Sequence, residues 1–198
     1  MSFEIVTFGD PILRARAKPV VRVTPEYKHL VDGMMEAMHA AEGIGLAAQQ
    51  VARTVSVCVI DIPAELDVEE EGGPPLNPGI PMPLVMFNPK ILSKGGAMTR
   101  RDEGCLSFPG IHSAVQRAVE VEVAFVDWKG ELKTLRCRGL LARAVQHELD
   151  HLDGVLLVDR ISPVKKISMA GKLKRLREET EERLQEKKTM SAQRVQQL

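Results

Sequence analysis

The pattern of apolar residues predicts a helix near the amino terminus. Thr24 suits the N-cap position, Pro25 suits the first helical position, and Glu42-Gly43 ends the pattern. Between them, apolar residues recur at helical spacing on one face: Tyr27, Leu30, Val31, Met34, Met35 and Met38. A methionine stripe is more often core packing than a binding surface, so we interpret this face as core.

Later segments have the composition of strands. Residues 55–62 are nearly all apolar and β-branched, which indicates a buried strand. Residues 84–92 form a second strand, where Pro89 indicates an edge or a bulge, and Gly95-Gly96 then makes a turn. Residues 119–126 alternate apolar with mostly acidic positions, and a turn at 127–130 leads to residues 131–137. These two segments are expected to pair as a hairpin.

Two stretches differ from the rest in composition. Residues 63–83 hold six prolines, three glycines and three consecutive glutamates, so we expect an exposed loop insertion without regular structure. Residues 163–198 should form a helical tail, with six basic and no acidic residues between 164 and 177. The sequence therefore predicts one domain over residues 1–162 and a basic tail. That tail either stays in solvent or docks on a partner.

Overall composition excludes several classes of protein. The chain has 198 residues, enough for one domain with its own core, and 27 basic against 27 acidic residues. The zero net charge gives no general attraction to DNA or to a membrane. Residues 1–20 lack the long apolar run of a signal peptide, and no stretch reaches the length of a membrane span. The three cysteines are too scattered for a disulfide framework, which favours a reducing, cytoplasmic setting.

The stretch with the clearest chemistry is Gln146-His147-Glu148-Leu149-Asp150-His151. On a helix that follows Gly139, His147 and His151 lie one turn apart on one face, so both imidazoles can bind the same metal ion. Glu148 lies close enough to take a proton from a water on that ion, and His-Glu-x-x-His is a short metallohydrolase signature. The plainer alternative is a helix with two surface histidines. We favour the metal site.

Two other stretches are weaker signals by themselves. Gly43-Ile44-Gly45 indicates either a tight structural turn or backbone that a ligand approaches closely. Cys105 follows Glu103-Gly104 in a loop or strand end, where it is either a buried thiol or the third metal ligand. Cys58 and Cys137 lie within strand patterns, so we interpret both as packing residues.

Three motifs together resemble those of the peptide deformylase family: Gly43-Ile44-Gly45-Leu46-Ala47-Ala48-Gln49-Gln50, Glu103-Gly104-Cys105-Leu106-Ser107 and the His147–His151 stretch. The resemblance extends from Gly9 to about Asp159. It implies an α+β fold in which antiparallel sheets pack around a central helix that carries His-Glu-x-x-His, with a C-terminal helix. It also implies hydrolysis of the N-formyl group from the N-terminal formyl-methionine of new proteins, releasing formate.

The resemblance also assigns roles to residues. It implies that Cys105, His147 and His151 bind the metal, that Glu148 is the general acid and base, and that Gln50 and Leu106 contact the formyl oxygen. The residues expected to bind substrate come from three segments: Ile44, Gly45, Glu103, Gly104, Leu140 and Ala144. Asp150, paired with Arg117, is expected to face away from the metal and to orient the ligands without binding the ion.

Two features depart from the family pattern. The first is the segment 63–83, which looks longer than the usual connection at that point, and the second is a single position. Arg143 occupies a place where the family usually has an apolar residue that lines the methionine pocket. We expect its stem to pack while its guanidinium extends to solvent. The alternative is that Arg143 enters the pocket and changes the substrate preference.

The resemblance implies one divalent ion per chain, Fe2+ in the cell, with Zn2+, Ni2+ or Co2+ acceptable in the purified protein. The implied partners are N-formyl-methionyl nascent peptides and the ribosome, through the C-terminal basic helix, with no DNA and no membrane. A zinc metallopeptidase is disfavoured because its third ligand should lie downstream, whereas His29, His39 and His112 lie upstream. A non-enzymatic family member that only binds nascent chains or ribosomes would be expected to lose Glu148, Cys105 or Gln50, and this chain keeps all three.

Overall fold

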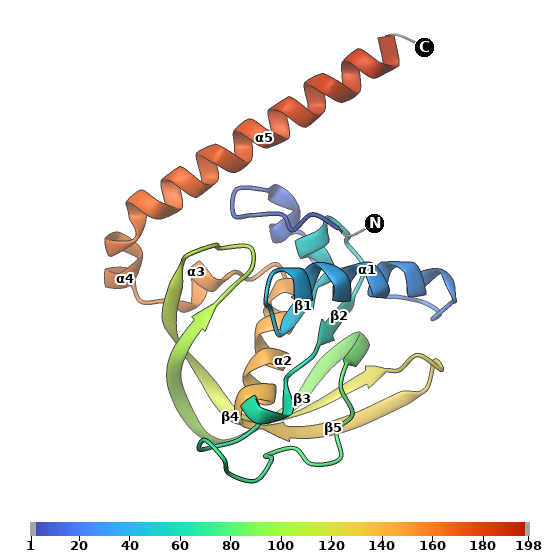
Figure 1. Cartoon of the computed structure of the whole chain (residues 1–198), viewed down its shortest axis with the longest axis vertical. Coiled ribbons are helices and arrows are strands. Elements are labelled where there is room, and N and C mark those ends of the chain that lie inside the picture. Colours follow the sequence, from blue (N-terminus) through green and yellow to red (C-terminus); the bar gives the residue numbers. More distant parts are fainter. Residues whose placement is uncertain (1–2, 197–198) are drawn as a thin grey trace.

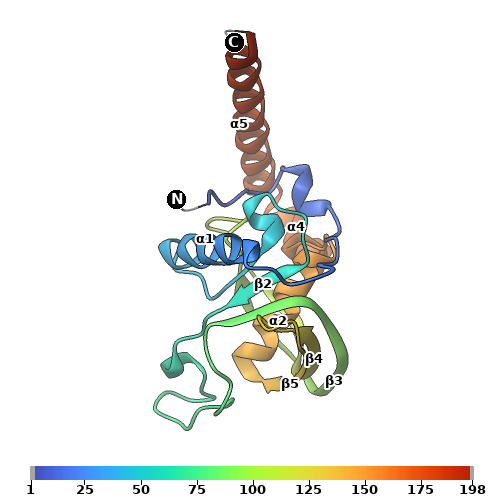
Figure 2. The same ribbon diagram turned by 90° about the vertical axis from the view of Figure 1, so that its right-hand side faces the viewer.

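The computed structural model describes residues 3–196 (Figure 1). Within them, the strands form one five-stranded sheet in chain order, and every neighbouring pair is antiparallel. The strands are β1 (Gly45–Ala47), β2 (Val57–Ile60), β3 (Leu84–Gly104), β4 (His112–Val126) and β5 (Leu132–Arg138). Helix α2 (Gly139–Leu152) follows β5 and contacts all five strands, so it occupies the centre of the molecule (Figures 1 and 2). The predicted α+β fold is confirmed.

The remaining helices surround this centre. They are α1 (Glu26–Ala40), α3 (Leu157–Arg160), α4 (Pro163–Ser168) and α5 (Ala170–Gln196), with short 3-10 turns at Pro11–Arg14, Ala48–Val51 and Ala64–Leu66. None of the described helices is both long and apolar enough to cross a bilayer.

Strand β2 separates two hydrophobic clusters. Cys58 and Ile60 face the cluster that contains α2, whereas Val57 and Val59 face the cluster that contains α1. Because side chains alternate across a strand, burial on both faces explains why residues 57–60 are apolar without exception. The methionine stripe of α1 belongs to the second cluster, and its interpretation as core is confirmed at Met34.

The predicted N-cap of α1 is wrong by one residue. The helix begins at Glu26 with Pro25 in the N-cap position and without a side-chain cap. The Thr24 hydroxyl is buried and has no hydrogen-bond partner among the described residues. Thr24 instead contributes its carbonyl, which accepts from the Tyr27 N–H at 3.1 Å.

The predicted turn at Gly95-Gly96 is also wrong. β3 runs without interruption through both glycines, and the pairing with β4 shifts register near Pro89, between Ile91 and Ser93, and again after Gly95. Gly96 has a φ of 68°, so the glycine pair forms part of a bulge and not the end of a strand. Bulges bend a strand, and these let β3 curve while it stays paired with β4. The predicted bulge at Pro89 and the β4–β5 hairpin are confirmed.

Gln146 fixes α2 against β4. Its side chain is buried, donates to the Ala118 carbonyl at 2.9 Å and accepts from the Ala118 N–H at 3.2 Å. Leu141 and Val145 are also fully buried on this side of the helix. Burying one such side chain stabilises the fold by about 1.5–3 kcal/mol. The helix therefore cannot rotate without losing both packing and hydrogen bonds.

The segment from 63 to 83 is mostly exposed, as expected, but it is not without structure. A 3-10 turn covers Ala64–Leu66, and Asp67 and Asn77 are buried. The Asn77 amide accepts from the Arg138 N–H at 2.9 Å and donates to the Arg138 carbonyl at 3.1 Å. The loop is thereby attached to the residue just before α2.

The tail is helical as predicted, except for a break at Met169 between α4 and α5. Met169 and Leu176 are buried in the same cluster as Phe8 and Phe108, so the start of the tail packs on the domain. Further along α5, Arg183 and Lys187 still pair with Glu4 of the amino-terminal segment, and only the end of the helix projects away from the rest of the molecule (Figure 1). The last two predicted tail positions, 197 and 198, lie outside the described residues.

Candidate metal centre and substrate cavity

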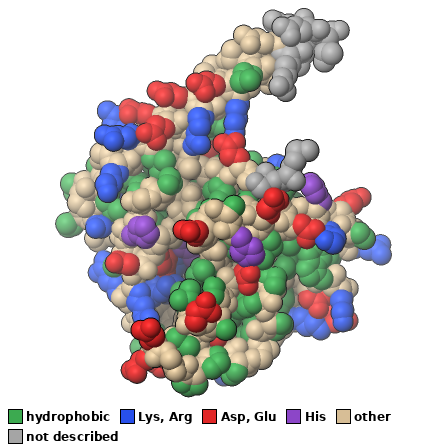
Figure 3. Space-filling view, viewed as in Figure 1, with side chains coloured by type: hydrophobic (Ala, Val, Ile, Leu, Met, Phe, Trp, Pro, Cys, Tyr) green, Lys and Arg blue, Asp and Glu red, His purple; other side chains and the backbone are tan. Residues whose placement is uncertain are grey.

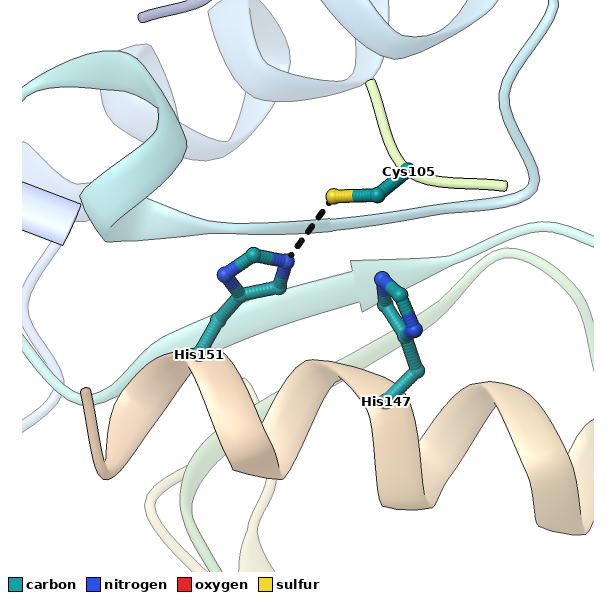
Figure 4. Close-up of side chains that lie close together, drawn as sticks. All are labelled: Cys105, His147 and His151. Carbon is teal, nitrogen blue, oxygen red and sulfur yellow. Dashed lines mark hydrogen bonds between the residues drawn. The ribbon is translucent and has the colours of Figure 1, made fainter. Parts of the chain in front are cut away.

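The three predicted ligands converge. His147 and His151 lie on α2 one turn apart, and Cys105 follows the last residue of β3. One ligand atom from each lies within 4.8 Å of the other two, and Cys105 Sγ is 3.2 Å from His151 Nε2 (Figure 4). One sulfur and two imidazole nitrogens form the N/S donor set that tetrahedral divalent metals favour. The residues present therefore suit a metal ion.

The two histidines differ in their second ring nitrogen. His147 Nδ1 is 3.1 Å from Glu103 Oε2, so that carboxylate turns Nε2 toward Cys105. His151 Nδ1 is buried and has no hydrogen-bond partner among the described residues. Burial, reinforced by the charges of His147 and Arg117, lowers the pKa of His151 well below its ordinary value. His151 is thus neutral, as a metal ligand must be.

His147 shows the opposite effect. Burial opposes its charged form, but hydrogen bonds with Cys105 and Glu103 raise the pKa of His147 well above its ordinary value. A metal ligand must be deprotonated, so binding of a metal ion here would be coupled to loss of this proton.

The Glu148 side chain is buried beside the ligands. Its Oε2 is buried with no hydrogen-bond partner among the described residues, and burial raises the pKa of Glu148 to about 7. Gly45 makes room for this side chain, since a Cβ there would lie 2.4 Å from Glu148 Oε1. Gly43 likewise makes room for Leu106, at 2.6 Å. The sequence indicated close approach to these glycines, and the groups that approach are side chains of the other two motifs.

The Gln50 amide points toward Cys105. Its Oε1 accepts from the Ala47 N–H at 2.9 Å, which fixes the orientation of the side chain. Its Nε2 then lies 3.2 Å from Ser107 Oγ and 3.7 Å from Cys105 Sγ. Ser107 was not among the predicted site residues, although it lies in the second motif and its full burial is consistent with a role in orienting Gln50.

Behind the ligands lies a network of buried charges. Arg117 donates to both oxygens of Glu103 at 3.0 Å and to Asp150 at 2.5 Å, so the predicted pairing of Asp150 with Arg117 is confirmed. Burial opposes ionisation of Glu103, but hydrogen bonds from His147 and Arg117 lower its pKa to about 2. Arg160 of α3 also donates to Asp150, at 2.9 Å, and only its basic character could have suggested this from the sequence.

The expected orientation of Arg143 is wrong. The residue is only 7% exposed, so its side chain does not extend into solvent as expected. Instead, Nη1 donates to Glu103 Oε1 at 2.6 Å and Nη2 donates to the Thr99 carbonyl at 3.1 Å. The buried carboxylate of Glu103 offers this guanidinium a partner that water would otherwise provide.

A cavity of about 570 Å³ opens beside the ligands. The predicted site residues that line it include Ile44, Gly45, Gln50, Glu103, Gly104, Cys105, Leu106, Leu140, Ala144, His147 and Glu148. Ile44, Leu140 and Ala144 give it an apolar wall, while the Glu103 carboxylate is committed to Arg117, Arg143 and His147. Cys58 and Cys137 lie in the core, where burial raises the pKa of both thiols, as expected of packing residues.

The fold is α+β, and its central helix presents two histidines and a buried glutamate to a cysteine beside an apolar cavity. This combination is typical of metal-dependent hydrolases. Comparisons with known proteins identify the family. The family model for polypeptide deformylase matches residues 2–167. A peptide deformylase of Orientia tsutsugamushi (strain Boryong) is 40% identical over 174 residues, which cover 88% of this chain and 94% of that protein.

Solved structures agree. Peptide deformylase 1B of Arabidopsis thaliana, in complex with an inhibitor, superposes with a TM-score of 0.79 at 39% identity, covering 91% of this chain and 93% of that one. The Thermotoga maritima peptide deformylase gives 0.70 at 36% identity, covering 82% and 99%. The chain belongs to the peptide deformylase family. It is a hydrolase that removes the N-formyl group from the formyl-methionine of newly synthesised proteins and releases formate.

Proposed function

We propose that Cys105, His147 and His151 hold one divalent metal ion and that Glu148 is the general acid and base of the reaction. The convergence of the three ligand atoms within 4.8 Å, beside a buried glutamate, carries this proposal. A divalent ion held by these residues would act as a Lewis acid toward water and the formyl group. We favour Fe2+ in the cell because of the family resemblance, and the same donors accept Zn2+, Ni2+ or Co2+.

Glu148 handles the proton. Its carboxylate accepts a proton from the attacking water, whose oxygen adds to the formyl carbon, and it returns that proton to the amine as the carbon–nitrogen bond breaks. Formate and a free amino terminus are the products. Burial raises the pKa of the Glu148 carboxyl, which helps this group to keep the proton between the two steps.

Gln50 and Leu106 stabilise the developing negative charge. Gln50 Nε2 is already aimed at the metal ligands by the bond between its Oε1 and the Ala47 N–H. The Leu106 backbone N–H supplies the second donor. A preorganised donor of this kind typically contributes about 3–4 kcal/mol of transition-state stabilisation.

The cavity binds the formyl-methionyl peptide. The apolar wall of Ile44, Leu140 and Ala144 accommodates the unbranched methionine side chain, which adapts well to such a surface. Backbone at Gly45 and Gly104 pairs with the extended peptide, since both residues line the cavity at strand ends. Asp150 and Arg117 orient the ligands through Glu103.

We further propose a cytoplasmic location and a division of labour along the chain. Residues 1–162 form the catalytic domain, which includes the loop insertion at 63–83, and residues 163–198 form a tail that docks on the ribosome. Lys165 and Lys166 are exposed at the start of this tail, which holds no acidic residue before Glu178. Further along α5, acidic and basic side chains intermingle (Figure 3). Changing both to glutamate should weaken co-sedimentation with purified ribosomes. Unchanged co-sedimentation would contradict docking through the tail.

Anaerobic purification tests the metal site directly. Metal content and formate release from formyl-methionyl peptides are measured on the intact protein and on Cys105→Ala. The variant should lose most of its metal and activity because the thiolate is a ligand. Cys58→Ala and Cys137→Ala are matched controls, and both should keep one ion per chain. Stoichiometric metal in Cys105→Ala would refute the ligand set.

A further inference from the structure

We infer that Arg143 is a positioning residue that holds His147 in place through Glu103. The inference rests on the proposed role of His147 as a metal ligand. Arg143 and His147 lie one turn apart on α2 and contact the two different oxygens of the same carboxylate. Arg143 Nη1 is 2.6 Å from Glu103 Oε1, and His147 Nδ1 is 3.1 Å from Glu103 Oε2.

Arg117 is shared between Glu103 and a second carboxylate. It donates to both oxygens of Glu103 at 3.0 Å, but it also donates to Asp150 at the shorter distance of 2.5 Å. Its single positive charge is therefore divided between two carboxylates. Arg160 compensates Asp150 from the exposed side, and Arg143 compensates Glu103 from the buried side. Arg143 thus supplies a second cation that fixes the position of the Glu103 carboxylate.

Arg143 is itself held rigidly. Nη1 also donates to the Val115 carbonyl at 3.0 Å, and Nη2 lies 3.1 Å from both the carbonyl and the hydroxyl oxygen of Thr99. These contacts connect α2 to β3 and β4 at once. A buried guanidinium is costly unless its donors are satisfied, and here they are satisfied by groups that belong to the two long strands. The planar fork of arginine makes these contacts together, which a lysine ammonium cannot do.

The consequence concerns metal retention. Without Arg143, the Glu103 carboxylate loses one of the partners that fix its rotation, and the His147 ring loses its fixed orientation. Removing a partner that orients a ligand typically weakens metal affinity or activity by about 10–100-fold. We expect this weaker affinity to appear as faster dissociation of the metal ion. Arg143 contacts Glu103, which orients the ligand His147, and does not contact His147 itself.

The test uses the full-length protein loaded with Zn2+ and measures release of the ion to a colorimetric chelator. Arg143→Met should release zinc about 10–100-fold faster than the unmodified protein. Arg138→Met is the matched control, because Arg138 immediately precedes the same helix but its side chain is half exposed and bonded only weakly, to Glu69 at 3.8 Å. This control should release zinc at the unmodified rate. Circular dichroism of the metal-free proteins establishes that each variant is folded.

Arg143→Lys provides a second variant in case Arg143→Met does not fold. It keeps the charge without the fork, so it should release zinc faster than the unmodified protein and more slowly than Arg143→Met. Unmodified protein that fails to bind one zinc ion would refute the proposed metal site. If it binds zinc normally and the folded Arg143 variants release it at the unmodified rate, the role of Arg143 is refuted while the metal site stands.

Discussion

Gly45→Ala should separate the position of Glu148 from its chemistry. Gly45 is the first residue of β1, and its φ lies outside the left-handed region, so alanine can adopt the same backbone conformation. The added Cβ would, however, lie 2.4 Å from Glu148 Oε1 and 3.0 Å from Cδ of the same carboxyl group. Either the carboxylate or the strand must move.

The size of the effect follows from this distance. Non-bonded heavy atoms separate to about 3.5 Å, so the carboxylate must retreat by about 1 Å. A displacement of about 1 Å at a reacting group can reduce the rate by roughly 10²-fold, equivalent to about 2.7 kcal/mol. The cost in folding should be much smaller, because the group that moves is the end of a flexible side chain. Alanine also stabilises by about 0.4–1 kcal/mol through the unfolded chain.

The assay compares kcat/KM for a formyl-methionyl peptide, metal content and Tm. We expect activity to fall by roughly 10²-fold while metal content and Tm stay close to those of the unmodified protein. Gly171→Ala is the matched control, since no described atom lies within 4 Å of its added Cβ and it should remain fully active. Activity of Gly45→Ala within threefold of the unmodified protein (roughly 0.7 kcal/mol) would show that the position of Glu148 is not critical.

Three further predictions concern the base, the pocket and a surface contact. Glu148→Ala should keep its metal while kcat falls by about 10²–10⁴-fold, and loss of the metal instead would make Glu148 a ligand. Formyl-alanyl peptides should have a kcat/KM about 10–200-fold below that of formyl-methionyl peptides, because they leave the apolar wall uncovered; equal values would discard the pocket. Burial raises the pKa of Asp159, but hydrogen bonds from Arg14 and the Leu156 N–H outweigh burial and lower the pKa overall. The contribution of Asp159 to stability is therefore present above the unfolded pKa and is lost as the pH falls through the folded pKa. Asp159→Asn should therefore cost about 0.5–1 kcal/mol at neutral pH, and the difference in unfolding free energy should disappear once the pH falls below the folded pKa of Asp159.

Local patterns allowed much of the fold to be predicted. Residues 57–60 are apolar because both faces of β2 are buried, and that requirement is visible within the segment itself. The same holds for His147 and His151, whose spacing places them on one face wherever a helix forms. The turn predicted at Gly95-Gly96 is wrong because a glycine pair favours positive φ both in turns and in bulges. Only the pairing of β3 with β4 distinguishes the two.

The orientation of Arg143 could not be predicted for a different reason. An arginine on a helix extends to solvent unless a buried anion meets it, and the anion here is Glu103, forty positions earlier. The residues near Arg143 in the sequence do not indicate that Glu103 is its partner. Such contacts between distant segments depend on the curvature of β3, and β3 is continuous through the turn that the sequence predicts at Gly95-Gly96.

The end of β3 explains why Glu103, Gly104 and Cys105 act as one unit. The strand ends at Gly104, so Cys105 leaves the sheet toward His151, while Glu103 is still paired in the strand and turns its carboxylate toward His147. Gly104 separates them without a side chain, because a Cβ there would lie 2.8 Å from His112 Nε2. Three consecutive residues thus provide one ligand, the support of a second ligand and the space between them. A shift of one residue in the register of β3 would turn the side chains of Glu103 and its neighbours to the opposite face of the sheet. The bulges of β3 therefore help to determine the position of the metal site.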